Sequence, residues 1–124
     1  MSIVSKIISS GLLFFFTIVT GIWLSNSGKP LNSLILNIHK LIALGSVIFI
    51  VIVIRNLLKN AGSSQVILTL IIMTGLFVLA LFVSGALLSF GKPVNNIILT
   101  IHAVTPIPAV ITTAMIIYLL LSRK

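Results

Sequence analysis

The chain has 124 residues, of which 59% are hydrophobic and only 6% are charged, and its eight Lys and Arg residues give a net charge of +8. A soluble domain carries roughly a quarter of its residues as charged side chains, so this composition excludes a water-facing surface and predicts an integral membrane protein. The absence of Asp, Glu and Cys excludes carboxylate acid–base catalysis, Ser-His-Asp triads, intramembrane carboxylate relays and thiolate metal sites.

Four stretches are long and apolar enough to cross a bilayer core of ~30 Å, which needs ~20 helical residues. They run over about Ile7–Ser25, Leu34–Ile54, Val66–Phe90 and Ile97–Leu121. Turn sequences separate them, at Asn26–Pro30, Lys59–Ser64 and Gly91–Pro93. The first stretch lacks a small-residue cleavage site, so we expect a span rather than a signal peptide. The predicted fold class is therefore all-α, an integral membrane four-helix bundle in which residues 1–124 form a single domain.

The cations are distributed unequally between the two ends of these spans. One end carries five, which are Lys6, Arg55, Lys59, Arg123 and Lys124, and the other carries three, which are Lys29, Lys40 and Lys92. Since positive residues favour the cytoplasmic side, both termini are expected in the cytoplasm, in a membrane of the prokaryotic cytoplasmic type. Scattered cations at helix ends meet lipid headgroups, so the expected partner of these charges is the lipid bilayer, and nucleic-acid binding is not expected.

The second half of the chain repeats the first. Residues 28–39 (GKPLNSLILNIH) align with residues 91–102 (GKPVNNIILTIH) at a spacing of 63, and Thr20-Gly21 aligns with Ser84-Gly85 at a spacing of 64. A shared Gly-Lys-Pro turn, a shared small-residue–glycine pair and a shared histidine exceed what chance produces in apolar helices. We infer a tandem duplication of one helical hairpin, over about 7–54 and 66–121, with the copies related by a pseudo-two-fold axis along the membrane normal.

Each repeat carries one histidine, His39 or His102. The second helices of the two hairpins run parallel, so both imidazoles are expected at one depth, ~10–14 Å from the outer turns. An ionisable residue at such a depth faces the bundle interior and is a functional candidate. Gly21 and Gly85 precede the turns by six or seven residues and fall at about the same level, where glycine permits close approach. We expect these four residues to frame one pocket on the axis.

This pocket predicts one haem b, with the two histidines as axial metal ligands and the two glycines against the edges of the ring. Cations and amides near the outer turns are expected to pair with the propionates, namely Lys29, Lys92, Asn32 and Asn95. A six-coordinate haem in a sealed bundle favours one-electron transfer, so the chain is expected to be a membrane oxidoreductase or electron carrier without catalytic side chains. A quinone, a redox protein or a larger membrane complex is its expected partner.

A Ser/Thr-Gly pair before the turn and a histidine in the next helix resemble the four-helix membrane b-type cytochromes, which include cytochrome b561 and bacterial superoxide oxidase. The resemblance covers all four helices in architecture and implies haem-based electron transfer. Those proteins generally hold two haems, one near each membrane face. Here the positions about two to four turns beyond each histidine include Ile, Val, Thr and Met and hold no further histidine, so at most one haem is expected.

Other interpretations stay open. The histidines could pack helices by bonding a carbonyl or a Ser/Thr hydroxyl, as in a non-catalytic structural subunit of a membrane complex. They could instead bind a (bacterio)chlorophyll, a quinone, a metal ion or the substrate of a small transporter or channel. The asparagines could be helix N-caps, and the lysines interfacial anchors. Pro106 and Pro108 predict a kink in the fourth span.

Overall fold

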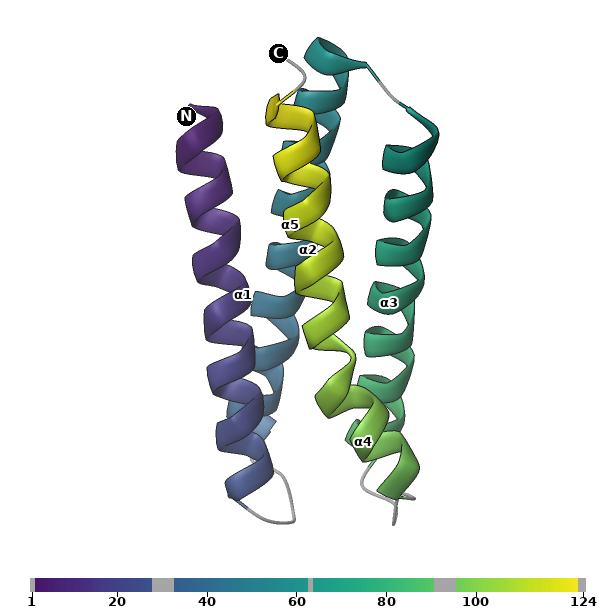
Figure 1. The fold of residues 1–124 in the computed structure, drawn as a ribbon. Helices are drawn as coiled ribbons and strands as arrows, with labels where there is room; N and C mark the ends of the chain where they lie inside the picture. The colour runs from purple at the N-terminus through teal and green to yellow at the C-terminus, as the bar shows by residue number, and fades with distance from the viewer. Residues whose placement is uncertain (1, 28–32, 63, 91–95, 123–124) are drawn as a thin grey trace. The chain divides into compact units, whose positions relative to one another are not determined.

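A computed structural model describes residues 2–27, 33–62, 64–90 and 96–122. The regular structure of these residues is entirely α-helical, and the helices are α1 (Ile3–Asn26), α2 (Ser33–Ala61), α3 (Gln65–Ser89), α4 (Asn96–Val104) and α5 (Pro106–Ser122) (Figure 1). The first three helices have 24, 29 and 25 residues, and α4 and α5 share the 27-residue stretch Asn96–Ser122. All four stretches are long and apolar enough to cross a membrane, which confirms the predicted number of spans.

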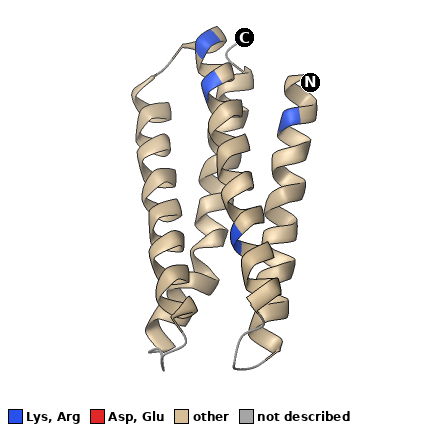
Figure 2. Ribbon diagram, turned by 180° about the vertical axis from the view of Figure 1, so that it is seen from behind, with Lys and Arg blue, Asp and Glu red and all other residues tan. Residues whose placement is uncertain are grey.

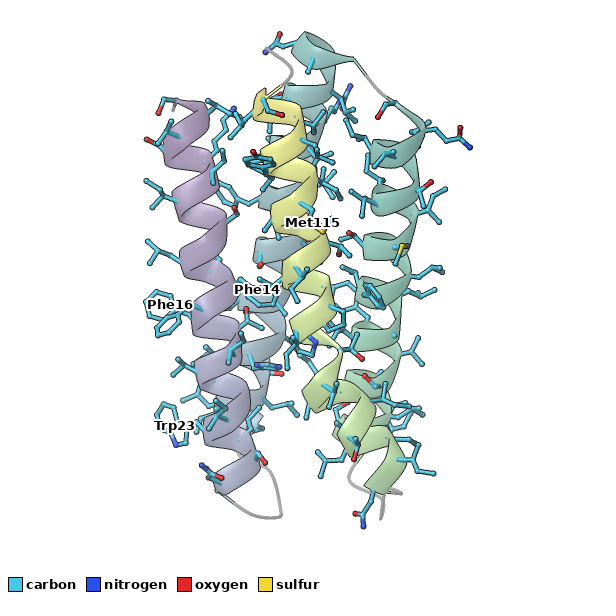
Figure 3. All side chains as sticks on the ribbon, viewed as in Figure 1. Phe14, Phe16, Trp23 and Met115 are labelled. Carbon is cyan, nitrogen blue, oxygen red and sulfur yellow. The ribbon has the colours of Figure 1, made fainter. Side chains whose placement is uncertain are left out.

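The exposed surface of these helices suits lipid rather than water. Large apolar side chains are exposed along every helix, and Phe16 and Trp23 project away from α1 in Figure 3. A water-soluble protein rarely exposes such a continuous apolar surface, whereas acyl chains solvate it without penalty. The four helices therefore fit a lipid bilayer environment.

The helix α2 is longer than its predicted span. It continues past Ile54 and ends at Ala61, so the prediction that a turn begins at Lys59 is wrong. The turn lies at Gly62, which has a positive φ of 72° and donates its N–H to the Leu58 carbonyl at 2.9 Å. The reason is that hydropathy marks only the apolar part of a helix, while Arg, Lys and Asn sustain the backbone ladder beyond it. Figure 2 shows the basic residues of the described chain against a background that contains no acidic ones.

The chain divides into two compact units, Met1–Arg55 and Asn56–Lys124. In the first unit, α1 and the greater part of α2 run antiparallel (Figure 1). In the second unit, α3 packs antiparallel to α4 and α5. The helices α1 and α3 begin in the same way, because the Ser2 and Ser64 hydroxyls accept hydrogen bonds from backbone N–H groups in the first turn.

Buried stripes on α3 and α5 hold the second unit together. Their members recur every three or four residues and are Ile67, Leu70 and Thr74 on α3 with Ala109, Thr112, Ile116 and Leu120 on α5. The Thr74 hydroxyl donates to the Thr112 hydroxyl oxygen at 2.7 Å, and Thr112 donates to the Pro108 carbonyl at 2.9 Å. This buried bond sets the register between the two helices, because neither hydroxyl has water as an alternative partner in a bilayer.

The fourth span is interrupted at Thr105, between α4 and α5, as the prolines predicted. Pro106 has no N–H, so it cannot supply the helical hydrogen bond to the carbonyl of His102, four residues earlier. The Thr105 N–H bonds the Ile101 carbonyl at 3.0 Å, and the Ala109 N–H bonds the Thr105 carbonyl at 3.2 Å, which keeps the ladder on either side. The helix α2 has no such interruption after His39.

Candidate functional site

In the first unit, His39 of α2 packs against α1. The histidine is the seventh residue of its helix, and its ring is half-buried. Its Nδ1 lies 3.0 Å from the Thr20 Oγ1. A Cβ added at Gly21 would stand 3.0 Å from the imidazole Cε1, closer than carbon atoms in ordinary contact, and 3.5 Å from Nδ1. The ring can lie this close to α1 because residue 21 is glycine.

In the second unit, His102 of α4 packs against α3 in the same manner. It is again the seventh residue of its helix and half-buried. Its Nδ1 lies 2.9 Å from the Oγ of the buried Ser84. A Cβ added at Gly85 would stand 3.1 Å from Cε1 and 3.6 Å from Nδ1.

Both hydroxyls are tied to the backbone of their own helix as well as to the ring. The Thr20 hydroxyl lies 2.9 Å from the Phe16 carbonyl and 3.0 Å from the Thr17 carbonyl, and the Ser84 hydroxyl lies 3.2 Å from the Leu81 carbonyl. The same chain of contacts, from carbonyl to hydroxyl to imidazole, therefore occurs in both units. The residues involved are separated by the spacings found in the sequence, 64 for the hydroxyl and glycine residues and 63 for the histidines.

The predicted site included the histidines and glycines but not Thr20 and Ser84. A signal for them exists in the sequence, because each stands directly before one of the two glycines and both carry a hydroxyl. A hydroxyl is a small side chain that can hydrogen-bond a ring nitrogen within an apolar helix pair. Helix periodicity alone does not select it, since the rotation of α1 and α3 about their axes depends on packing.

The remaining predicted contacts stay predictions. The residues expected to meet the propionates lie outside the described part of the chain, and they are Lys29, Lys92, Asn32 and Asn95. The atoms found nearest to Gly21 and Gly85 are those of the imidazoles, so contact between these glycines and a cofactor edge is also untested. Joint ligation by His39 and His102 stays a prediction too, because the two residues belong to different units.

The available donor atoms restrict what the site could hold. The chain has two histidines and no Asp, Glu or Cys, and the described residues contain no group of three or more such side chains around one point. A zinc site normally needs three or four protein ligands. Two imidazoles suffice where the cofactor brings its own equatorial ligands, as haem does. Because Nδ1 of each ring is engaged within its own hairpin, Nε2 is the nitrogen that would bind iron.

Comparison of the chain with protein-family models, curated proteins and solved structures finds no match. The functional assignment therefore rests on the histidine contacts themselves.

Proposed function

We propose that the chain is a tandem duplication of one helical hairpin and acts as a b-type cytochrome that holds one haem b between His39 and His102. The observation that carries this proposal is the repeated histidine contact. In each hairpin an imidazole lies against a glycine, 3.0 or 3.1 Å from the position that a Cβ would take there, and is bonded at Nδ1 by a hydroxyl. The proposal agrees with the resemblance to four-helix membrane b-type cytochromes.

The comparison of the two hairpins favours a shared task for the histidines. The hydroxyl residue differs between them, Thr20 in one and Ser84 in the other, yet the hydroxyl, the glycine and the histidine are present in both. The engagement of the same ring nitrogen in each hairpin suits a pair of axial ligands, because both rings would then present Nε2 to one metal.

The residues of the chain suit haem in charge and in polarity. When bound, haem supplies reversible one-electron exchange at its iron. Neutral imidazoles can hold iron without a carboxylate or thiolate, and two axial protein ligands favour electron transfer over O₂ binding. Near the outer turns, Lys29 and Lys92 would balance the propionate charges, and the amides of Asn32 and Asn95 would donate hydrogen bonds to them.

The distribution of cations supports an orientation for this cytochrome. Lys6, Arg55 and Lys59 belong to the more basic end of the spans, so we infer that both termini are cytoplasmic and that the haem lies nearer the outer face. A single haem at that depth covers only part of the bilayer. Its electron partner is therefore expected within the membrane or at the outer surface, as a quinone, a redox protein or another subunit of a complex.

The visible spectrum of the purified protein tests the proposal. Protein from haem-replete cells should show a Soret band and a sharp reduced α-band, with one haem per chain. His39→Ala and His102→Ala should each lose these bands, whereas Asn37→Ala, an exposed change on α2, should keep them.

Protein without Soret absorption would overturn the proposal. Stable protein that lacks pigment, and in which His39→Gln and His102→Gln are tolerated, would assign the pair to helix packing in a structural subunit. That second function is favoured by the same hydroxyl–imidazole contacts, which also join two helices. Absorption typical of chlorophyll in place of haem would identify a different macrocycle on the same histidines.

A further inference from the structure

The proton of each hydroxyl determines which nitrogen of the neighbouring imidazole is protonated. A hydroxyl carries one hydrogen, and a carbonyl oxygen can only accept. The Thr20 Oγ1 lies 2.9 Å from the Phe16 carbonyl and 3.0 Å from His39 Nδ1, so a hydroxyl that donates to the carbonyl must accept from the ring. In a bilayer the donation to the carbonyl of the preceding turn is favoured, because no water competes for the hydroxyl hydrogen.

The second hairpin leads to the same assignment from its own contacts. The Ser84 hydroxyl donates to the Leu81 carbonyl and lies 2.9 Å from His102 Nδ1. Because the single hydroxyl hydrogen goes to the Leu81 carbonyl, the Ser84 oxygen accepts from the ring, and this requires an N–H at Nδ1. Nδ1 is the ring nitrogen nearer to α3, since it would lie 3.6 Å from a Cβ at Gly85 against 3.9 Å for Nε2.

We propose that Thr20 and Ser84 are positioning residues that hold His39 and His102 in the Nδ1–H tautomer, so that Nε2 is presented to the haem iron with raised basicity. This inference rests on the proposed function. A hydrogen bond from the non-ligating N–H of a histidine to an acceptor orients the ring and strengthens its donation to the metal. Stronger donation stabilises ferric over ferrous iron, so these hydroxyls lower the midpoint potential of the haem.

The expected change in haem affinity and midpoint potential can be taken from other metal proteins in which the hydrogen-bond partner of a ligating histidine is removed. Removing an outer partner of a metal-bound histidine lowers metal affinity by about 10- to 100-fold. If the variant weakens binding of ferric haem more than binding of ferrous haem, the midpoint potential rises. Each tenfold decrease in the affinity for ferric haem relative to ferrous haem raises this one-electron potential by about 59 mV. Thr20→Val and Ser84→Ala are therefore expected to weaken haem binding and to shift the potential upward.

The chain offers matched controls on the same helices. Thr17→Val and Ser89→Ala remove hydroxyls whose bonds are confined to their own helix, to the Leu13 carbonyl at 2.8 Å and the Ala86 carbonyl at 2.9 Å. Two conservative variants, Thr20→Ser and Ser84→Thr, place in one hairpin the residue that the other already uses. These two variants keep the hydroxyl but change the side-chain volume, so they should keep the wild-type potential. If altered packing caused the shift, their potentials would shift too.

Two measurements test the proposal, one of them without haem. In protein freed of haem and reconstituted in lipid, ¹⁵N NMR of the imidazoles should show a protonated Nδ1 and an unprotonated Nε2, and Thr20→Val should abolish this preference at His39. In loaded protein, a redox titration should show higher potentials for Thr20→Val and Ser84→Ala than for their controls.

Distinct results separate this inference from the proposed function. The role of Thr20 and Ser84 is wrong if the wild-type protein binds haem but Thr20→Val and Ser84→Ala have the same potential as the controls Thr17→Val and Ser89→Ala. It is also wrong if NMR shows Nε2–H in the wild type. In both cases the proposed cytochrome function stands. If the wild-type protein binds no haem, both are wrong.

Discussion

Replacing Gly21 with alanine tests the contact between α1 and His39 directly. An added Cβ would stand 3.0 Å from the imidazole Cε1, whereas at Gly11, on the same helix, no atom lies within 4 Å of the added group. The second unit contains an equivalent pair, since the distance at Gly85 is 3.1 Å and Gly75 is open. The same chemical change is therefore expected to strain the protein at one position of each helix and not at the other.

The loss of stability expected for Gly21→Ala follows from the contact distances. Carbon atoms in contact prefer about 3.5–4.0 Å, so the ring must retreat by a few tenths of an ångström. The ring is held by its bond to Thr20 at 3.0 Å, and interhelical bonds of this kind contribute about 0.6 and at most about 1.7 kcal/mol. Overpacking of a close contact costs about 1–3 kcal/mol. Alanine also gains up to about 1 kcal/mol of helix propensity, but Gly11→Ala shares that gain.

The difference between the paired variants therefore isolates the clash. We expect Gly21→Ala to be about 1–3 kcal/mol less stable than Gly11→Ala, and Gly85→Ala to differ from Gly75→Ala by a similar amount. The free energy of unfolding in bicelles, followed by circular dichroism, provides the measurement. Equal stabilities within both pairs would refute the close approach of the imidazoles to α1 and α3.

Three further predictions concern the rest of the fold. Thr74→Val should lower the free energy of unfolding by about 0.6–1.7 kcal/mol because it removes a buried hydrogen bond to α5. The control Thr69→Val loses only a hydrogen bond within α3 and should lower it less. Equal losses in the two variants would contradict the conclusion that the Thr74–Thr112 bond sets the register between α3 and α5. Pro106→Ala should join α4 and α5 into one helix, seen as helical backbone shifts across the junction by solid-state NMR, and a persisting break would assign it to another cause. The chain has no native cysteine, so single cysteine variants can report the topology with a membrane-impermeant maleimide. Ser2→Cys should react only after the cells are permeabilised, whereas Ser27→Cys should react in intact cells. The reverse pattern would show that the termini lie outside.

The helical architecture was predictable because it depends on quantities that are local in the chain. Apolar length predicted four spans, and the ring of Pro106 predicted the interruption of the fourth, since the missing N–H is a property of that residue alone. The end of α2 was not predicted correctly. Hydropathy falls at Arg55, but the backbone hydrogen bonds continue to Ala61 and stop only where Gly62 adopts a positive φ.

The sequence by itself determined that the chain has two histidines in matching contexts, a glycine upstream of each, and no other strong metal ligand. Only the tertiary structure showed that each imidazole lies against the glycine of its own hairpin and that Thr20 and Ser84 meet Nδ1. The physical reason is that spacing along a helix specifies which residues share a face, but not which face turns toward a neighbour. That rotation is decided by packing, and here it brings a hydroxyl of the adjacent helix to Nδ1 of each imidazole.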